Sequence, residues 1–82
     1  METLTVYGTS WCGDCICSRS LLDRRGVEYR WVDIDEDREA DVTVRHLNRG
    51  NRSVPTLVFP DGSILVEPSD RQLTEHLDQR GL

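Results

Sequence analysis

The chain has 82 residues, a net charge of −5 and 37% hydrophobic residues, which suits one small domain spanning residues 1–82. It contains no apolar run of 18 residues, and its acidic balance would repel a phosphate backbone, so we expect neither a membrane nor a nucleic-acid partner. The first ten residues lack the basic and apolar regions of a signal peptide, and three cysteines fit a paired disulfide framework poorly, so we predict a cytoplasmic protein.

The first half of the chain predicts a strand, a helix and a second strand. Residues 4–7 alternate and are rich in β-formers, and residues 27–33 do the same. Between them, residues 15–25 follow helical spacing, and Gly26 is suited to end that helix. Three side chains share one face of the helix: Cys15, Ser18 and Leu22. A strand–helix–strand unit of this kind should have two parallel strands joined by a right-handed crossover.

The second half predicts a helix, a hairpin and a final helix. The acidic run 33–37 suits the first turn of a helix that continues to about Asn48, since negative charge there meets the positive end of the helix dipole. A run of charges such as this one is usually just a solvated face. Residues 54–59 and 64–66 have strand patterns, and residues 60–63 form a turn between them. A capping box at Ser69 then predicts a last helix that ends near Arg80. The order β-α-β-α-β-β-α predicts an α/β fold, with one mixed sheet of four strands and helices on its faces.

Cys12 and Cys15 form a C-x-x-C motif between the first strand and the first helix. Next to a strand–helix–strand pattern in a cytosolic chain, this motif is typical of a thioredoxin-like redox site. A helix N-terminus stabilises a thiolate, so we expect Cys12 to attack and Cys15, one turn further in, to resolve. The alternatives are a structural cysteine pair and a zinc site. Zinc needs about four ligands, and His46 and His76 lie far from the motif in sequence.

Two neighbouring residues raise separate questions. Asp14 lies inside the motif, where its charge opposes a thiolate at Cys12 but also suits a first helical turn. Cys17 lies about 200° around the helix from Cys15, so it should point sideways or outward and be a bystander rather than a catalyst.

The strand–WCGDC–helix opening, the segment Ser53-Val54-Pro55 and the βαβαββα length together resemble glutaredoxins over the whole chain. The resemblance is closest to the mycoredoxin branch, through the pieces TSWCG, GNRSVPT and the DGS turn. It implies a thioredoxin fold, a cis peptide between Val54 and Pro55, and a groove for a low-molecular-weight thiol beside Cys12. With the cis bond, Val54 would present its backbone to an extended substrate as one more strand.

The resemblance also implies a set of residues around the substrate and the small thiol: Trp11, Gly13, Asp14, Arg52, Val54, Pro55, Ser69 and Asp70. Trp11 would cover the site or pack in the core. Arg52 would meet a carboxylate or sulfonate, or be a solvated loop arginine. Glutaredoxins usually have Gly-Gly-x-Asp after the last strand, whereas this chain has residues 67–70, EPSD. That departure favours mycothiol over glutathione. Ser69 and Asp70 would then bind a sugar or amide, or simply cap the last helix.

The sequence therefore predicts a monomeric dithiol oxidoreductase that holds no bound cofactor and uses a low-molecular-weight thiol, mycothiol or glutathione, as co-substrate. Its partners would be disulfide-containing or S-thiolated proteins and an upstream flavin disulfide reductase. One alternative is a protein-specific electron donor, of the kind that serves ribonucleotide reductase, reduced directly by thioredoxin reductase. Another is an iron–sulfur cluster carrier in which two chains use Cys12 and bound thiols.

Overall fold

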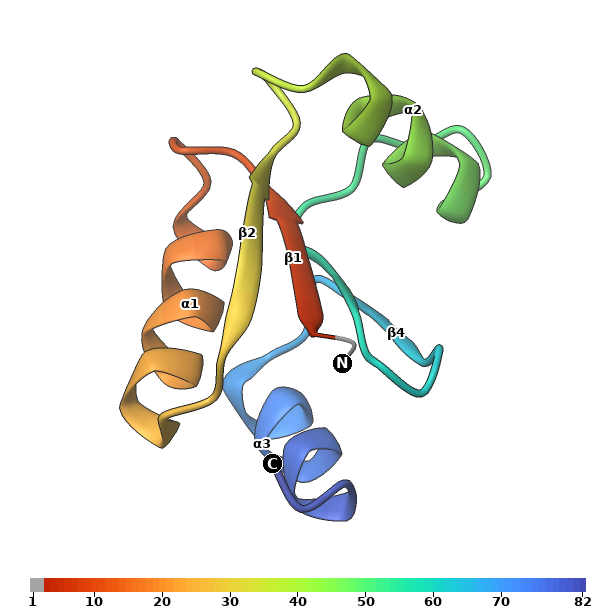
Figure 1. Cartoon of the computed structure of the whole chain (residues 1–82). Helices are drawn as coiled ribbons and strands as arrows, with labels where there is room; N and C mark the ends of the chain where they lie inside the picture. Colours follow the sequence, from red (N-terminus) through yellow and green to blue (C-terminus); the bar gives the residue numbers. More distant parts are fainter. Residues whose placement is uncertain (1–2) are drawn as a thin grey trace.

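A four-stranded sheet with the order β2-β1-β3-β4 forms the centre of the computed structural model, which describes residues 3–82 (Figure 1). Strand β1 (Leu4–Gly8) is parallel to β2 (Tyr29–Asp33) and antiparallel to β3 (Thr56–Val58). Strand β4 (Ile64–Val66) is antiparallel to β3. The predicted element order and the mixed sheet are confirmed.

Helices cover both faces of this sheet. Helices α1 (Gly13–Arg25) and α3 (Asp70–Gln79) pack on one face, and α2 (Arg38–Leu47) lies on the other (Figure 1). The larger core lies under α1 and α3 and consists of Leu4, Val6, Leu21, Leu22, Leu57, Phe59, Leu73 and Leu77. The smaller core lies under α2 and consists of Ile34, Ala40 and Val44. None of the helices formed by residues 3–82 has the length and apolar run needed to cross a lipid bilayer.

The ends of the helices follow the local chemistry of the chain. Gly26 ends α1 in the left-handed conformation, with φ of 70°, and its N–H reaches the last turn of the helix. Ser69 and Gln72 form the predicted capping box at the start of α3. These caps fix the direction in which each helix leaves the sheet.

Some element boundaries differ from the prediction. Helix α2 begins at Arg38, because residues 33–37 fold into turns in which the Asp33 side chain accepts from the Asp35 N–H, and Asp37 then caps the helix. The third strand begins only at Thr56, two residues later than predicted, after a cis peptide between Val54 and Pro55. The acidic run is therefore a loop beside the sheet rather than the first turn of α2.

Candidate active site

Cys12 lies where the chain leaves the sheet and enters α1, at the N-cap position of that helix. Its sulfur accepts the backbone N–H of Cys15 at 3.2 Å, and its S–H faces the carbonyl oxygen of Val54 at 3.8 Å. The side chain is half-buried. The sulfur therefore lies at the positive end of a helix dipole, where a thiolate is stabilised, and beside the backbone that precedes the cis proline.

Cys15 is completely buried and points from α1 onto the end of β1. A methyl group on Gly8 would lie 2.6 Å from the Cys15 sulfur and 2.6 Å from the nearest atom of the Trp31 ring, so the sulfur packs directly on Gly8 next to the indole. Burial, and then the hydrogen bond with Cys12, raise the pKa of the Cys15 thiol to about 12. Cys15 is thus a protonated thiol at neutral pH, which is the state expected of a residue that does not attack first.

Trp31 forms the wall beside Cys15, a role that sequence reasoning did not identify. The guanidinium of Arg19 lies 4.1 Å from the centre of the indole, and its Nε donates to the Tyr29 hydroxyl at 3.3 Å. This cation–π stack holds the indole in place. Alternation along β2 placed Trp31 on one face of the sheet, but nothing in the sequence indicated that the face meets a cysteine.

Thr9 is the second residue that sequence reasoning missed. Its side chain is 1% exposed, and its hydroxyl has no hydrogen-bond partner among residues 3–82. Its backbone hydrogen bond with Cys15 partly offsets the upward shift of the Cys15 pKa. A buried, unpaired hydroxyl costs stability and therefore marks an unusual position directly beside the dithiol.

Trp11 precedes Cys12 and is 69% exposed, so the predicted alternative of packing in the core is wrong. Its indole Nε1 donates to Oδ2 of Asp35 at 2.8 Å. Hydrogen bonds from Arg52 first, and from Trp11 second, lower the pKa of the Asp35 carboxyl below its usual range. Asp35 is therefore ionised at neutral pH and joins the β1–α1 loop to the β2–α2 loop.

Arg52 is neither a solvated arginine nor a free cation. Its Nε donates to Oδ2 of Asp41 at 2.8 Å, its Nη2 is paired with Oδ1 of Asp35, and its side chain is 26% exposed. The predicted partners, a carboxylate or sulfonate of the small thiol, would compete with these internal carboxylates. The charge that the sequence suggested for ligand binding is already compensated within the chain.

The remaining predicted residues lie in three segments, residues 9–14, 51–55 and 67–70, which together we call the rim. The Glu67 N–H donates to the carbonyl oxygen of Pro55 at 2.9 Å, which brings residues 67–70 next to the cis-proline segment. Ser69 accepts from the Gln72 N–H at 3.1 Å, so its capping role is confirmed. Within residues 3–82, the exposed carboxylates of three rim residues form no ion pair: Asp14, Glu67 and Asp70. Thus the uncompensated charges that these three residues contribute are negative.

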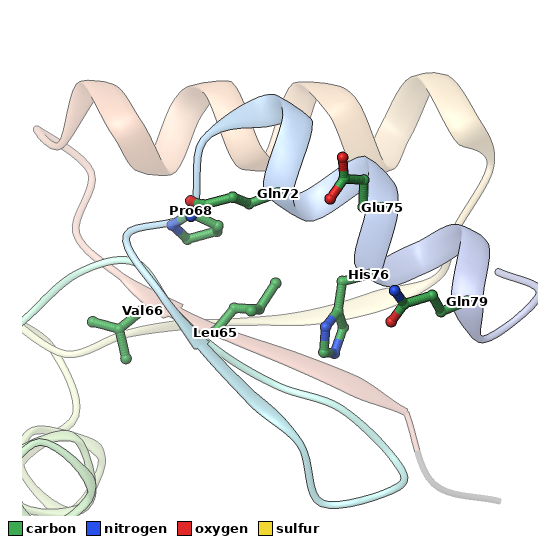
Figure 2. A pocket seen from close by; sticks show the side chains of 7 residues that line it. All are labelled: Leu65, Val66, Pro68, Gln72, Glu75, His76 and Gln79. Atoms are coloured by element: carbon green, nitrogen blue, oxygen red, sulfur yellow. The ribbon is translucent and has the colours of Figure 1, made fainter.

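Two other features lie outside this arrangement. Cys17 is exposed on α1, as its angle to Cys15 predicted. A groove of about 230 Å³ runs between β4 and α3, and Figure 2 shows its lining residues: Leu65, Val66, Pro68, Gln72, Glu75, His76 and Gln79. It reaches the rim only at Pro68 and includes neither cysteine of the motif.

Comparison with known proteins gives a consistent result. The glutaredoxin family model matches residues 4–64. Mycoredoxin 1 from Corynebacterium glutamicum is 44% identical over 69 residues, which are 83% of this chain and 84% of the relative. Two crystal structures have the same fold, which confirms the predicted thioredoxin fold. A mutant of the thioredoxin-like protein BC3987 has a TM-score of 0.80 at 24% identity, covering 92% of this chain and 99% of that chain. The glutaredoxin from Archaeoglobus fulgidus has a TM-score of 0.73 at 26% identity, covering 92% and 85% respectively.

Proposed function

The chain belongs to the glutaredoxin family of thiol–disulfide oxidoreductases, and on that premise we propose that it reduces mixed disulfides between proteins and an uncharged, mycothiol-like thiol through Cys12 and Cys15. Proteins of this family act on disulfides with a low-molecular-weight thiol as co-substrate. The proposal assigns residues 1–82 to one cytoplasmic, monomeric domain that receives electrons from the small thiol and its flavin-dependent reductase.

In the proposed reaction, the Cys12 thiolate attacks the mixed disulfide at the sulfur of the small thiol. The sulfur–sulfur bond breaks, the target protein leaves as a thiolate that takes up a proton, and Cys12 carries the small thiol. A second small thiol then attacks as its thiolate, releasing a small-molecule disulfide and restoring Cys12. Alternatively, Cys15 loses its proton, attacks Cys12 and releases the small thiol, leaving an internal disulfide.

The residue roles in this scheme are supported by the contrast between the two thiols. Cys12 is partly exposed at the start of α1, where the N–H of Cys15 already points at its sulfur. Cys15 is buried, and its pKa of about 12 keeps it protonated. The burial of Cys15 leaves Cys12 as the thiol that a second small thiol can reach to resolve the intermediate. The same difference in exposure means that a target protein would meet Cys12 first.

The negative charge of the rim is the observation that favours an uncharged small thiol. Residues 9–14, 51–55 and 67–70 contribute Asp14, Arg52, Glu67 and Asp70, and Arg52 is compensated by Asp35 and Asp41. A thiol with carboxylates, such as glutathione or bacillithiol, would therefore enter a field of like charge. Each exposed pair at about 4 Å would cost roughly 1 kcal/mol in water, and less in salt. Mycothiol has sugar hydroxyls and amides but no carboxylate, so it avoids this cost.

We expect the small thiol to lie between Cys12 and the backbone of Val54 and Pro55. The Val54 carbonyl oxygen already faces the Cys12 sulfur at 3.8 Å, so an extended substrate can pair with this backbone. Trp11, Gly13 and the rim residues Ser69 and Asp70 would surround it. The O–H of Ser69 can donate a hydrogen bond to a sugar hydroxyl, and the carboxylate of Asp70 can accept one from it.

A coupled NADPH-oxidation assay tests the proposal. One cysteine peptide is prepared as a mixed disulfide with mycothiol, with bacillithiol and with glutathione, and each is reduced with its own thiol and reductase. Mycothiol and bacillithiol both contain a sugar but differ in their carboxylates, so their comparison tests the charge with a sugar present in both. We expect the mycothiol system to be faster than both others by roughly tenfold, which corresponds to 1.4 kcal/mol. Equal rates with bacillithiol would contradict the charge argument, and reduction by thioredoxin reductase alone would favour the protein-specific donor.

A further inference from the structure

A chain of polar contacts connects the loop that leads to Cys12 with two other segments of the chain. Trp11 in the β1–α1 loop donates to Asp35 in the β2–α2 loop at 2.8 Å. Asp35 is paired through its other oxygen with Arg52, in the segment that leads to the cis proline. Arg52 also donates to Asp41 in α2 at 2.8 Å, and Asp41 accepts from Arg45 at 2.6 Å.

The Trp11 indole needs such support because little else holds it. The side chain is 69% exposed although it precedes Cys12 directly. A large aromatic ring that protrudes from a loop loses its rotamer freedom when a substrate binds against it, and that loss weakens binding. A hydrogen bond to an anchored carboxylate removes part of this freedom beforehand.

Asp35 is an anchored carboxylate. Its own side chain is tied to Arg52, whose guanidinium is only 26% exposed and is held from the other side by Asp41. Arg52 lies two residues before Val54, whose carbonyl oxygen faces the Cys12 sulfur. The same guanidinium thus fixes the carboxylate that holds the indole and the segment against which an extended substrate would lie.

We propose that Asp35 is a positioning residue for disulfide reduction, which fixes the Trp11 indole beside Cys12 and joins it, through Arg52, to the Val54 segment. The Trp11 indole and the Val54 segment then keep one relative position before a substrate arrives. Asp35 acts through Trp11 and does not touch the reacting atoms. The inference rests on the proposed role of Cys12 as the nucleophile.

An ordinary surface ion pair would behave differently. Exposed pairs contribute little to stability. A pair that lies away from Cys12 should also leave substrate binding unchanged. The chain contains such a pair between Arg25 and Asp78, at 3.0 Å, where the carboxylate is 61% exposed and the arginine is the last residue of α1. Asp78→Ala also removes one negative charge from an ion pair with an arginine. That arginine lies at the C-terminal end of α1, whereas Cys12 lies at its N-terminal end, so Asp78→Ala is the matched control for Asp35→Ala.

A double-mutant cycle tests the proposal. Asp35→Ala, Trp11→Phe and the double variant are assayed on a synthetic cysteine peptide carrying mycothiol and on the same peptide carrying glutathione. We expect Asp35→Ala to raise KM about three- to tenfold on the better substrate while kcat changes less than about twofold, because binding geometry is lost rather than reactivity. Trp11→Phe should raise KM similarly, and adding Asp35→Ala to it should change KM by less than about twofold.

A spectroscopic measurement gives an independent reading of the indole. In a Trp31→Phe background Trp11 is the remaining tryptophan of the chain, and Asp35→Ala should lower its fluorescence anisotropy while Asp78→Ala leaves it unchanged. Urea denaturation confirms that each variant is folded. The proposal is overturned if the KM effects of Asp35→Ala and Trp11→Phe multiply, or if Asp35→Ala matches Asp78→Ala in KM and anisotropy. Cys12→Ser tests the nucleophile separately, and the two peptides test the choice of thiol separately.

Discussion

Replacing Gly8 with alanine tests whether the packing around Cys15 is as tight as the structure indicates. A methyl group at this position would lie 2.6 Å from the Cys15 sulfur and 2.6 and 2.8 Å from two atoms of the Trp31 ring. Ordinary contacts between such atoms are about 3.5–4.0 Å, so both neighbours would have to move by about 1 Å. Neither moves easily, because Cys15 is completely buried and Arg19 stacks on the indole.

Overpacking of this kind costs about 1–3 kcal/mol of stability. In a chain of 82 residues, each kcal/mol lowers the midpoint of thermal unfolding by about 4–8 °C. The reduced form is the right one to measure, in urea and by heating, because a Cys12–Cys15 disulfide would add its own contribution. Because the clash displaces the Cys15 sulfur, we also expect the internal disulfide to form less readily, which raises the reduction potential of the couple.

The matched control lies in the same motif. A methyl group on Gly13, the first residue of α1, would have no atom within 4 Å, so Gly13→Ala should leave stability unchanged or raise it by about 0.4–1 kcal/mol. If Gly8→Ala were as stable as Gly13→Ala, the Cys15 sulfur would not rest on β1, and close packing against Gly8 could not be the cause of the burial of the second thiol.

The remaining predictions concern residues of the dithiol and its surroundings. Cys12→Ser should abolish disulfide reduction, whereas Cys15→Ser should keep small-thiol-dependent turnover in the coupled assay; the reverse pattern would exchange their roles. Cys17→Ser should change turnover little under reducing conditions, and a large loss with an unchanged circular dichroism spectrum would place this thiol in the mechanism. Thr9→Val removes a buried, unpaired hydroxyl, so urea unfolding should show about 1–3 kcal/mol more stability; a loss would reveal an undetected partner. Asp14→Asn removes a charge that opposes the Cys12 thiolate, so equilibration against a thiol buffer should give a potential less negative by up to roughly 30 mV, with a smaller shift in high salt.

Much of the fold could be predicted because its signals are local. The alternation of residues 4–7, the glycine that ends α1 and the capping box of Ser69 and Gln72 each depend on a few neighbouring residues. The angle between Cys15 and Cys17 follows from helix geometry alone, and it correctly separated a buried thiol from an exposed one. The error at the start of α2 has a local cause too, because the prediction did not include turns made by aspartate side chains.

The parts of the site that escaped prediction depend on contacts between distant segments. Arg52 looked like a free loop cation because its partners, Asp35 and Asp41, are 17 and 11 residues away in sequence. Trp31 and Gly8 likewise meet only through the parallel pairing of β1 and β2. A pattern within one segment contains no information about such pairs, and the charge of a ligand site depends on them.

The two thiols of the motif owe their different properties to separate parts of the structure. One turn of helix and the absence of a side chain at Gly8 place Cys15 in a dry position against the sheet, which raises its pKa. Cys12 lies half-buried at the N-cap of α1 and faces the Val54 carbonyl oxygen, and residues 67–70 are joined to that segment through Pro55. Substitutions in residues 67–70 can therefore change which small thiol approaches without changing the burial of Cys15. Conversely, substitutions at Gly8 change the couple without changing the charge of the rim. A variant that altered both at once would show that the two parts are coupled. The segment from Arg52 to Pro55, which contacts both Glu67 and Cys12, is where such coupling should be sought.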